Sequence, residues 1–160
     1  MKSTKKIAAA GVIAALVFVA TFFIRIPIPN GYLNLGDAVI LISTLMLGPF
    51  AAIPAAIGAG LADLISGYSV YVIPTILIKG LMGFTAGKIL SKEKTVSRKL
   101  IGFILAELIM VAGYFAFEAL PFMYGVEAAL VDVPLNAIQG AAAIVVALPA
   151  SFAGPLNKKL

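Results

Sequence analysis

The chain has 160 residues, of which 62% are hydrophobic and only 12% are charged. Soluble domains carry about 25% charged residues, and a fold of this length cannot bury so much apolar surface, so lipid is the expected solvent. The absence of Cys and His from the sequence excludes disulfides, thiol chemistry, a histidine base and the usual zinc sites.

Six apolar segments predict a single domain over 1–160, an all-α integral membrane protein built as a bundle of six transmembrane helices. The segments are 7–24, 38–47, 50–65, 74–90, 100–120 and 133–156. The first apolar segment is preceded by a basic N-terminal stretch, as in a signal peptide. However, it is long enough to span a bilayer, and the segment 22–32 offers no small-residue cleavage site.

The second apolar segment is unusually short. Asp37 stands directly before it, and Gly48 and Pro49 end it. We interpret Asp37 as a helix cap that accepts free backbone N–H groups and matches the helix dipole. Gly ends helices and Pro is tolerated in the first turn, so the second and third helices are expected to form a tight hairpin.

Basic residues are distributed asymmetrically. Six spans would put both termini on one side, and every Lys and Arg except Arg25 and Lys79 falls on that side: Lys2, Lys5, Lys6, Lys88, Lys92, Lys94, Arg98, Lys99, Lys158 and Lys159. All acids except Glu93 lie elsewhere. The positive-inside rule therefore predicts that the N- and C-termini are cytoplasmic. Because membrane topology accounts for the cations, no nucleic-acid partner is expected.

Polar side chains gather in the predicted outer half of the bundle. Ionisable residues inside a span are costly, and they usually face the bundle interior or a wet cavity. We therefore expect a pocket open to the outside and covered by Tyr-bearing loops. Its candidate substrate-binding residues are Asn34, Asp63, Tyr68, Tyr71, Lys79, Tyr114, Glu118, Asn136 and Gln139.

Simpler interpretations of the same residues stay open. Lys79 can pair with Asp63 or Glu118 to lock the bundle, alone or together with a binding role. Asn136 and Gln139 can serve as hydrogen bonds between helices.

The outer tyrosines also fit an interfacial aromatic belt; they are Tyr32, Tyr68, Tyr71 and Tyr124. Glu107 lies deeper than the other acids. For Glu107 a structural hydrogen bond is favoured over a role in proton coupling.

Small residues recur at helical spacing, which lets helices approach closely in lipid. Ala10 and Ala14 share one face of the first helix, and this face is a candidate contact with another membrane protein. The run 58–63, "GAGLAD", lacks the Gly-Lys-Ser/Thr of a phosphate-binding loop. Any ATP hydrolysis would then belong to a partner.

Three motifs in this order, "GYLNLGDAVILISTLMLGP", "ADLISGY" and "PTILIKGLMG", resemble the substrate-specific (S) components of energy-coupling factor (ECF) transporters. The resemblance is closest to the riboflavin-transporter group. It implies capture of a vitamin or precursor at the extracellular face of a prokaryotic cell membrane. It also implies assembly with a transmembrane coupling subunit and two cytoplasmic ATPases, through Ala10, Ala14 and the Gly48–Pro49 turn, and toppling of the whole subunit during transport.

The ligand identity is left open by the sequence. Donors, acceptors and aromatic faces suit a heteroaromatic ring with hydroxyl or amino groups, so riboflavin, hydroxymethylpyrimidine and a pyridoxine-type ring all fit. No cofactor or metal is expected, and no nucleophile–base pair suggests an enzyme. The alternative function is a stand-alone secondary carrier or small channel coupled to an ion gradient.

Overall fold

The computed structural model describes residues 3–92 and 94–153, and most of them are helical. The α-helices are α1 (Ser3–Phe23), α2 (Gly36–Leu47), α3 (Ala52–Ser66), α4 (Val72–Leu90), α5 (Val96–Glu118) and α6 (Val126–Ala150). Two short 3-10 helices, η1 (Gly48–Ala51) and η2 (Ser69–Tyr71), precede α3 and α4. A hairpin of β1 (Arg25–Ile28) and β2 (Gly31–Asn34) connects α1 to α2.

Five stretches of the described chain are long and apolar enough to cross a membrane. They are Thr4–Phe23, Gly36–Ser66, Ser69–Leu90, Val96–Glu118 and Val126–Ala150. The second stretch contains both α2 and α3, which have 12 and 15 residues. Helices of these lengths reach only about 18 and 22 Å, less than the roughly 30 Å hydrocarbon core. The chain is therefore a helical multi-pass membrane protein, and the count of six spans stays a prediction.

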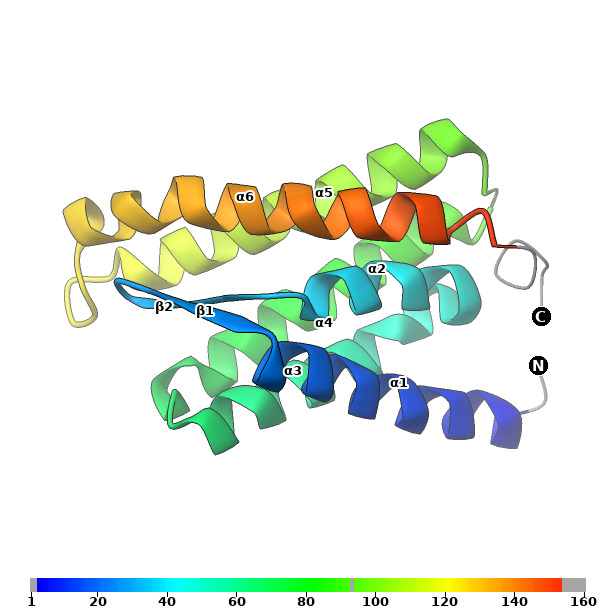
Figure 1. Ribbon diagram of the computed structural model, residues 1–160, viewed down its shortest axis with the longest axis horizontal. Helices are drawn as coiled ribbons and strands as arrows, with labels where there is room; N and C mark the ends of the chain where they lie inside the picture. The colour runs from blue at the N-terminus through cyan, green and yellow to red at the C-terminus, as the bar shows by residue number, and fades with distance from the viewer. Residues whose placement is uncertain (1–2, 93, 154–160) are drawn as a thin grey trace.

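Helix α2 lies in the middle of the bundle. It packs against α1, α4 and α6, and it contacts α3 only slightly. The chain does reverse direction at η1, as Gly48 and Pro49 predict, but α2 and α3 then diverge (Figure 1). The predicted hairpin is confirmed as a connection, whereas its tight packing is wrong because α1 and α4 supply the neighbours of α3.

The start of α1 and the end of α6 lie at the same end of the bundle (Figure 1). The loop between α4 and α5 lies at this end too, so the described cations other than Arg25 and Lys79 gather there. Lys2, Glu93, Lys158 and Lys159 lie outside the described residues. The cytoplasmic location of this end stays a prediction, and we call the opposite end the hairpin end.

The β-hairpin is a feature that the sequence analysis missed. Arg25 pairs with Asn34 and Ile28 pairs with Gly31 in an antiparallel register. The strands have four residues each and β1 contains Pro27, so the alternating pattern of a strand is too short to be distinguished from a loop. The hairpin extends from the start of α2 toward the end of the bundle opposite the termini, and β2 contacts α6 (Figure 1).

In the part of the bundle distant from the hairpin, small residues determine how closely the helices approach one another. A Cβ atom added at Gly83 would lie 2.9 Å from the carbonyl oxygen of Ala51, and one at Gly87 would overlap the backbone of Gly48. A Cβ at Gly58 would meet the carbonyl oxygen of Ala14. These contacts pack α4 onto η1 and α3 onto α1, as small residues do between helices in lipid.

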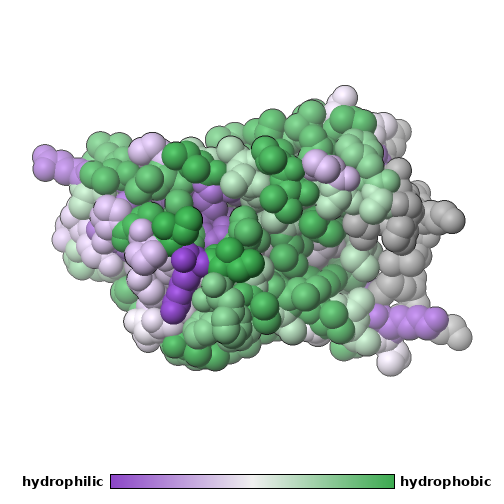
Figure 2. All heavy atoms as spheres, viewed as in Figure 1, coloured by the Kyte–Doolittle hydropathy of each residue, from purple (hydrophilic) through white to green (hydrophobic). Residues whose placement is uncertain are grey.

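The outer surface of the bundle is apolar. Large hydrophobic side chains such as Ile7, Leu77 and Val145 are 62%, 67% and 70% exposed. Figure 2 shows hydrophobic residues over the middle of the visible face and hydrophilic ones near the hairpin end. This is the surface expected of a protein whose neighbours are lipid chains.

Candidate functional site

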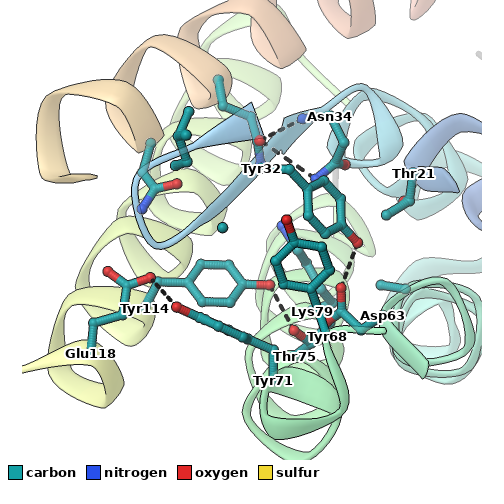
Figure 3. Close-up of a pocket in the computed structure, with 15 residues that line it drawn as sticks. Thr21, Tyr32, Asn34, Asp63, Tyr68, Tyr71, Thr75, Lys79, Tyr114 and Glu118 are labelled. Carbon is teal, nitrogen blue, oxygen red and sulfur yellow. Dashed lines mark hydrogen bonds between the residues drawn. The ribbon is translucent and has the colours of Figure 1, made fainter. Parts of the chain in front are cut away.

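A cavity lies beneath the hairpin, between the hairpin-end halves of the helices (Figure 3). All nine predicted substrate-binding residues line it: Asn34, Asp63, Tyr68, Tyr71, Lys79, Tyr114, Glu118, Asn136 and Gln139. Six further residues complete the lining, namely Thr21, Ile28, Gly31, Tyr32, Ala59 and Thr75. Residues from four long helices, α3 and the hairpin thus converge on one site, while their role in binding stays a prediction.

A buried polar network forms the floor of the cavity. Lys79 Nζ donates to Asp37 Oδ1 at 2.5 Å, and Gln139 Nε2 donates to Asp37 Oδ2 at 2.5 Å. The backbone N–H of Asn34 donates to Gln139 Oε1 at 2.8 Å. Asp37 and Lys79 are 0% and 2% exposed. The network therefore ties the base of the hairpin to α2, α4 and α6.

Two predictions about this network are wrong. Asp37 does not cap α2, because the N-cap position is Leu35 and no side chain accepts a capping hydrogen bond there. Asp37 lies in the first helical turn, where the dipole still favours its charge, but its two oxygens are taken by Lys79 and Gln139. Lys79 pairs with Asp37 rather than with Asp63 or Glu118.

Tyrosine rings form one wall of the cavity. The Tyr32 hydroxyl donates to Asp63 Oδ1 at 2.5 Å, and its ring lies 4.9 Å from that of Tyr68 between centroids. The rings of Tyr71 and Tyr114 lie 6.2 Å apart, and the Tyr114 hydroxyl is 3.0 Å from that of Thr75 (Figure 3). Burial, reinforced by Asp63, raises the pKa of Tyr32, so its hydroxyl stays protonated and donates.

The rim of the cavity is closed by contacts to the turn of the hairpin. The Tyr71 hydroxyl donates to the carbonyl oxygen of Asn30 at 2.5 Å and lies 3.1 Å from Glu118 Oε1. The backbone N–H of Asn30 donates to Asp132 Oδ2 at 3.2 Å, and its side-chain amide donates to the carbonyl of Ala128 at 3.1 Å. Asn30 thus attaches the hairpin turn to η2 and α6.

The side-chain amide of Asn136 is not engaged by the polar network. It is 6% exposed and lines the cavity, and no hydrogen bond joins its side chain to another described residue. A buried amide normally has partners, so its donors and acceptor are available to a bound molecule. The cavity volume is about 40 Å³, room for a few waters, so a ring-sized molecule would fit only if the hairpin or the tyrosines moved.

Glu107 differs from the prediction made for it. It is 5% exposed, and neither carboxylate oxygen has a hydrogen-bond partner among the described residues. The structural hydrogen bond favoured for Glu107 is therefore absent from this part of the chain. Its side chain packs against α6 at Gly140, where an added Cβ would lie 2.9 Å from Glu107 Cβ.

The predicted partner-facing residues lie away from the cavity. Ala10 is 8% exposed and packs in the core with Ala51 and Ala55. Ala10 and Ala14 also line an apolar groove between α1 and the start of α3. Gly48 and Pro49 form the start of η1, which packs against α4. Their contact with another subunit stays a prediction.

Tyr32 and Thr75 are the pocket residues whose position the sequence analysis should have identified. Tyr32 fits an aromatic belt, but it also lies in the same connection as the predicted pocket residue Asn34. Thr75 precedes Lys79 by four residues, one helical turn, so the two share a face of α4. Thr21 carried a weaker signal as an isolated polar residue near the end of an apolar helix.

Comparisons with known proteins agree with the three sequence motifs. The family described as "ECF-type riboflavin transporter, S component" matches residues 1–153. The "Thiamine precursor transporter HmpT" of Lactococcus lactis subsp. cremoris (strain MG1363) is 33% identical over 142 residues, which cover 86% of this chain and 80% of that protein. An "Uncharacterized protein in gap 3'region" of Pyrococcus woesei is 32% identical over 133 residues, covering 81% of this chain and 88% of the relative. The predicted resemblance is confirmed: the chain belongs to the family of S components of ECF-type riboflavin transporters, which are membrane transport components and not enzymes.

Proposed function

We propose that this chain captures a B-type vitamin or vitamin precursor in the cavity beneath the hairpin. The ligand would enter from the extracellular face of a prokaryotic cell membrane. A transmembrane coupling subunit and two cytoplasmic ATPases would then drive its uptake. On this proposal the protein is a binding subunit with no catalytic site of its own.

The convergence of nine polar and aromatic residues on one cavity in a membrane protein carries the proposal. Such residues are expensive in lipid, and they mark ligand or ion pathways. Here they come from the hairpin and from helices that are far apart in the sequence. Asn136, whose amide has no hydrogen-bond partner among the described residues, and the cluster of tyrosine rings supply the two kinds of contact that a planar heterocycle uses.

A thiamine precursor of the hydroxymethylpyrimidine type is the ligand that we propose first. The supporting observation is the similarity to HmpT, which is described as a thiamine precursor transporter. The cavity of about 40 Å³ also favours a small ring, because pockets for drug-sized molecules occupy about 300–1,000 Å³. Riboflavin, which gives the family its name, would need a larger opening of the hairpin.

The hairpin is suited to act as the cover of the site. Its turn is held by Asp132, Ala128 and Tyr71, and its base by Gln139. Between them, Tyr32 of β2 donates to Asp63 of α3. Breaking these few hydrogen bonds would let β1 and β2 swing away without disturbing the helical core. Ligand entry and release would then be limited by the lifetime of these contacts.

Mass spectrometry of small molecules released from the purified chain tests the proposal. We expect one heterocyclic vitamin or precursor to be enriched over a mock purification, and the same compound should raise the melting temperature when added back. A protein that releases nothing, and whose melting temperature no vitamin changes, would contradict the binding function.

An uptake measurement tests the role of the partners. Cells that express this chain alone should accumulate no labelled ligand, whereas cells that also contain the coupling subunit and the ATPases should accumulate it at the expense of ATP. Uptake by the chain alone, abolished by dissipating an ion gradient, would favour the secondary carrier instead.

A further inference from the structure

Two buried carboxylates next to the hairpin turn each have one oxygen without a partner among the described residues. Glu118 lines the cavity, whereas Asp132 is not among the lining residues and is joined to it through Asn30 and Tyr71. Glu118 Oε2 and Asp132 Oδ1 accept no hydrogen bond from the described residues. The two residues are 3% and 0% exposed, so bulk water does not substitute for a partner. An unsatisfied buried acceptor is costly, and more so when it is charged, so both oxygens call for an explanation.

The hairpin turn links the two carboxylates. The second oxygen of Asp132 accepts from the backbone N–H of Asn30, and the second oxygen of Glu118 lies 3.1 Å from the Tyr71 hydroxyl, which donates to the Asn30 carbonyl. Glu118 also lines the cavity (Figure 3). The pair therefore lies where the hairpin turn, η2 and α6 meet at the edge of the site.

No cation in the described chain neutralises this pair. Lys79 is engaged by Asp37 on the floor of the cavity. The guanidinium of Arg25 lies over the rings of Phe22 and Tyr32. Each carboxylate that is buried in its charged form carries a desolvation cost, and the hydrogen bonds from the neutral donors Asn30 and Tyr71 offset only part of it.

We propose that Glu118 and Asp132 form an acidic subsite, at the rim of the cavity, that binds a positively charged group. Such a group would supply what the two unpaired oxygens lack: an N–H or metal contact and a compensating charge. It can come from two sources, the amino group of the transported ligand or an inorganic cation from the medium. The first source rests on the proposed function, and it names ligands with an amino group as the preferred substrate class.

A matched pair of ligands tests the first source. Pyridoxamine and pyridoxine share one ring and differ in an aminomethyl group against a hydroxymethyl group, so only the former carries a cationic arm. A hydrogen bond to a charged group contributes about 1.5–3 kcal/mol, so the wild-type chain should bind pyridoxamine at least about tenfold more tightly. The same titration is made with hydroxymethylpyrimidine and riboflavin to establish that the cavity binds vitamins at all.

Glu118→Gln and Asp132→Asn remove the charges and keep the shape and one acceptor oxygen. Either change should reduce the preference for pyridoxamine to within about threefold, measured as the ratio of the two affinities in the same variant. Glu127→Gln is the matched control, because Glu127 is an exposed acid in the first turn of α6, and it should leave the preference unchanged. If Asp132→Asn fails to fold, because Asp132 also holds the hairpin turn, Glu118→Gln decides alone.

The melting temperature of the ligand-free chain tests the second source. NaCl or CaCl₂ replaces N-methylglucamine chloride at constant ionic strength. A cation that raises the melting temperature of the wild type and of Glu127→Gln, but not of Glu118→Gln, would identify the medium as the source.

The two proposals fail in different ways. Vitamins that bind without preference for an amino group, together with an unchanged response to cations, would overturn the subsite and leave the proposed function standing. A stabilising cation that depends on Glu118, with no vitamin bound, would leave the subsite standing and overturn the vitamin function. If no vitamin binds and no cation changes the melting temperature, both proposals are overturned.

Discussion

The hairpin end of the bundle and the opposite end are held together by different interactions. At the hairpin end, long polar side chains reach across the bundle, as Lys79 and Gln139 do to Asp37. At the other end, backbones lie nearly in contact because Gly83 and Gly87 carry no side chain. Polar contacts can be exchanged for contacts with a ligand, whereas close backbone packing cannot, so one end is suited to bind and the other to stay rigid.

Breaking the ion pair on the floor of the cavity should have the largest effect. Lys79→Met leaves Asp37 charged and buried, which costs about 3–5 kcal/mol of unfolding free energy. Denaturant unfolding in detergent would measure the loss. The double change with Asp37→Asn should recover part of it, and Lys88→Met, which alters an exposed lysine of the same helix, should have little effect. A loss in Lys79→Met no larger than in Lys88→Met would show that the pair is unimportant for stability.

A methyl group added at the tightly packed end of the bundle should have the second-largest effect. Gly87→Ala places a Cβ against the backbone of Gly48, and overpacking typically costs about 1–3 kcal/mol. Gly11→Ala is the control, since nothing lies within 4 Å of a Cβ there. The melting temperature should fall for Gly87→Ala only. Equal melting temperatures would mean that α4 and η1 can separate without penalty, contrary to the proposed rigidity.

Asn136→Ala should weaken ligand binding about tenfold, or about 1.4 kcal/mol, with little change in stability, because the amide has no hydrogen-bond partner among the described residues. Val145→Ala alters a lipid-facing residue of the same helix and should leave affinity unchanged. Isothermal titration with the ligand identified by mass spectrometry makes the comparison. An unchanged affinity in Asn136→Ala would contradict the prediction that α6 contributes to the binding surface.

The smallest effect on the isolated chain is expected at the groove between α1 and α3. Ala14→Leu should change ligand affinity by less than about twofold while it weakens co-purification with the coupling subunit. Val12→Leu, at an exposed position of the same helix, should affect neither. Equal losses of affinity and of assembly in Ala14→Leu would contradict the separation of the two faces.

The helices and the nine pocket residues were predictable because both follow from solvation. Long apolar segments must be helical in lipid, and polar side chains within them must avoid lipid, so Asp63, Tyr114 and Glu118 had to turn inward toward one region. The depth of each residue along its helix then placed them at the same end of the bundle.

Individual partners were not predictable in the same way. Asp37 follows the local pattern of a cap, yet tertiary contacts with Lys79 and Gln139 take its oxygens. Helical spacing does not say which of several acids lies across from Lys79. The hairpin was missed because four-residue strands depend on their pairing with each other more than on any local periodicity.

One feature of β1 bears on how the cover can move at the surface of a membrane. A two-stranded ribbon exposes an outer edge, and unpaired amide groups on that edge are costly where water is scarce. Pro27 has no amide hydrogen, so this edge has one donor fewer to satisfy, and an incoming strand finds less to pair with. If the hairpin moves as proposed for the cover of the site, it neither gains nor loses a hydrogen bond at that position.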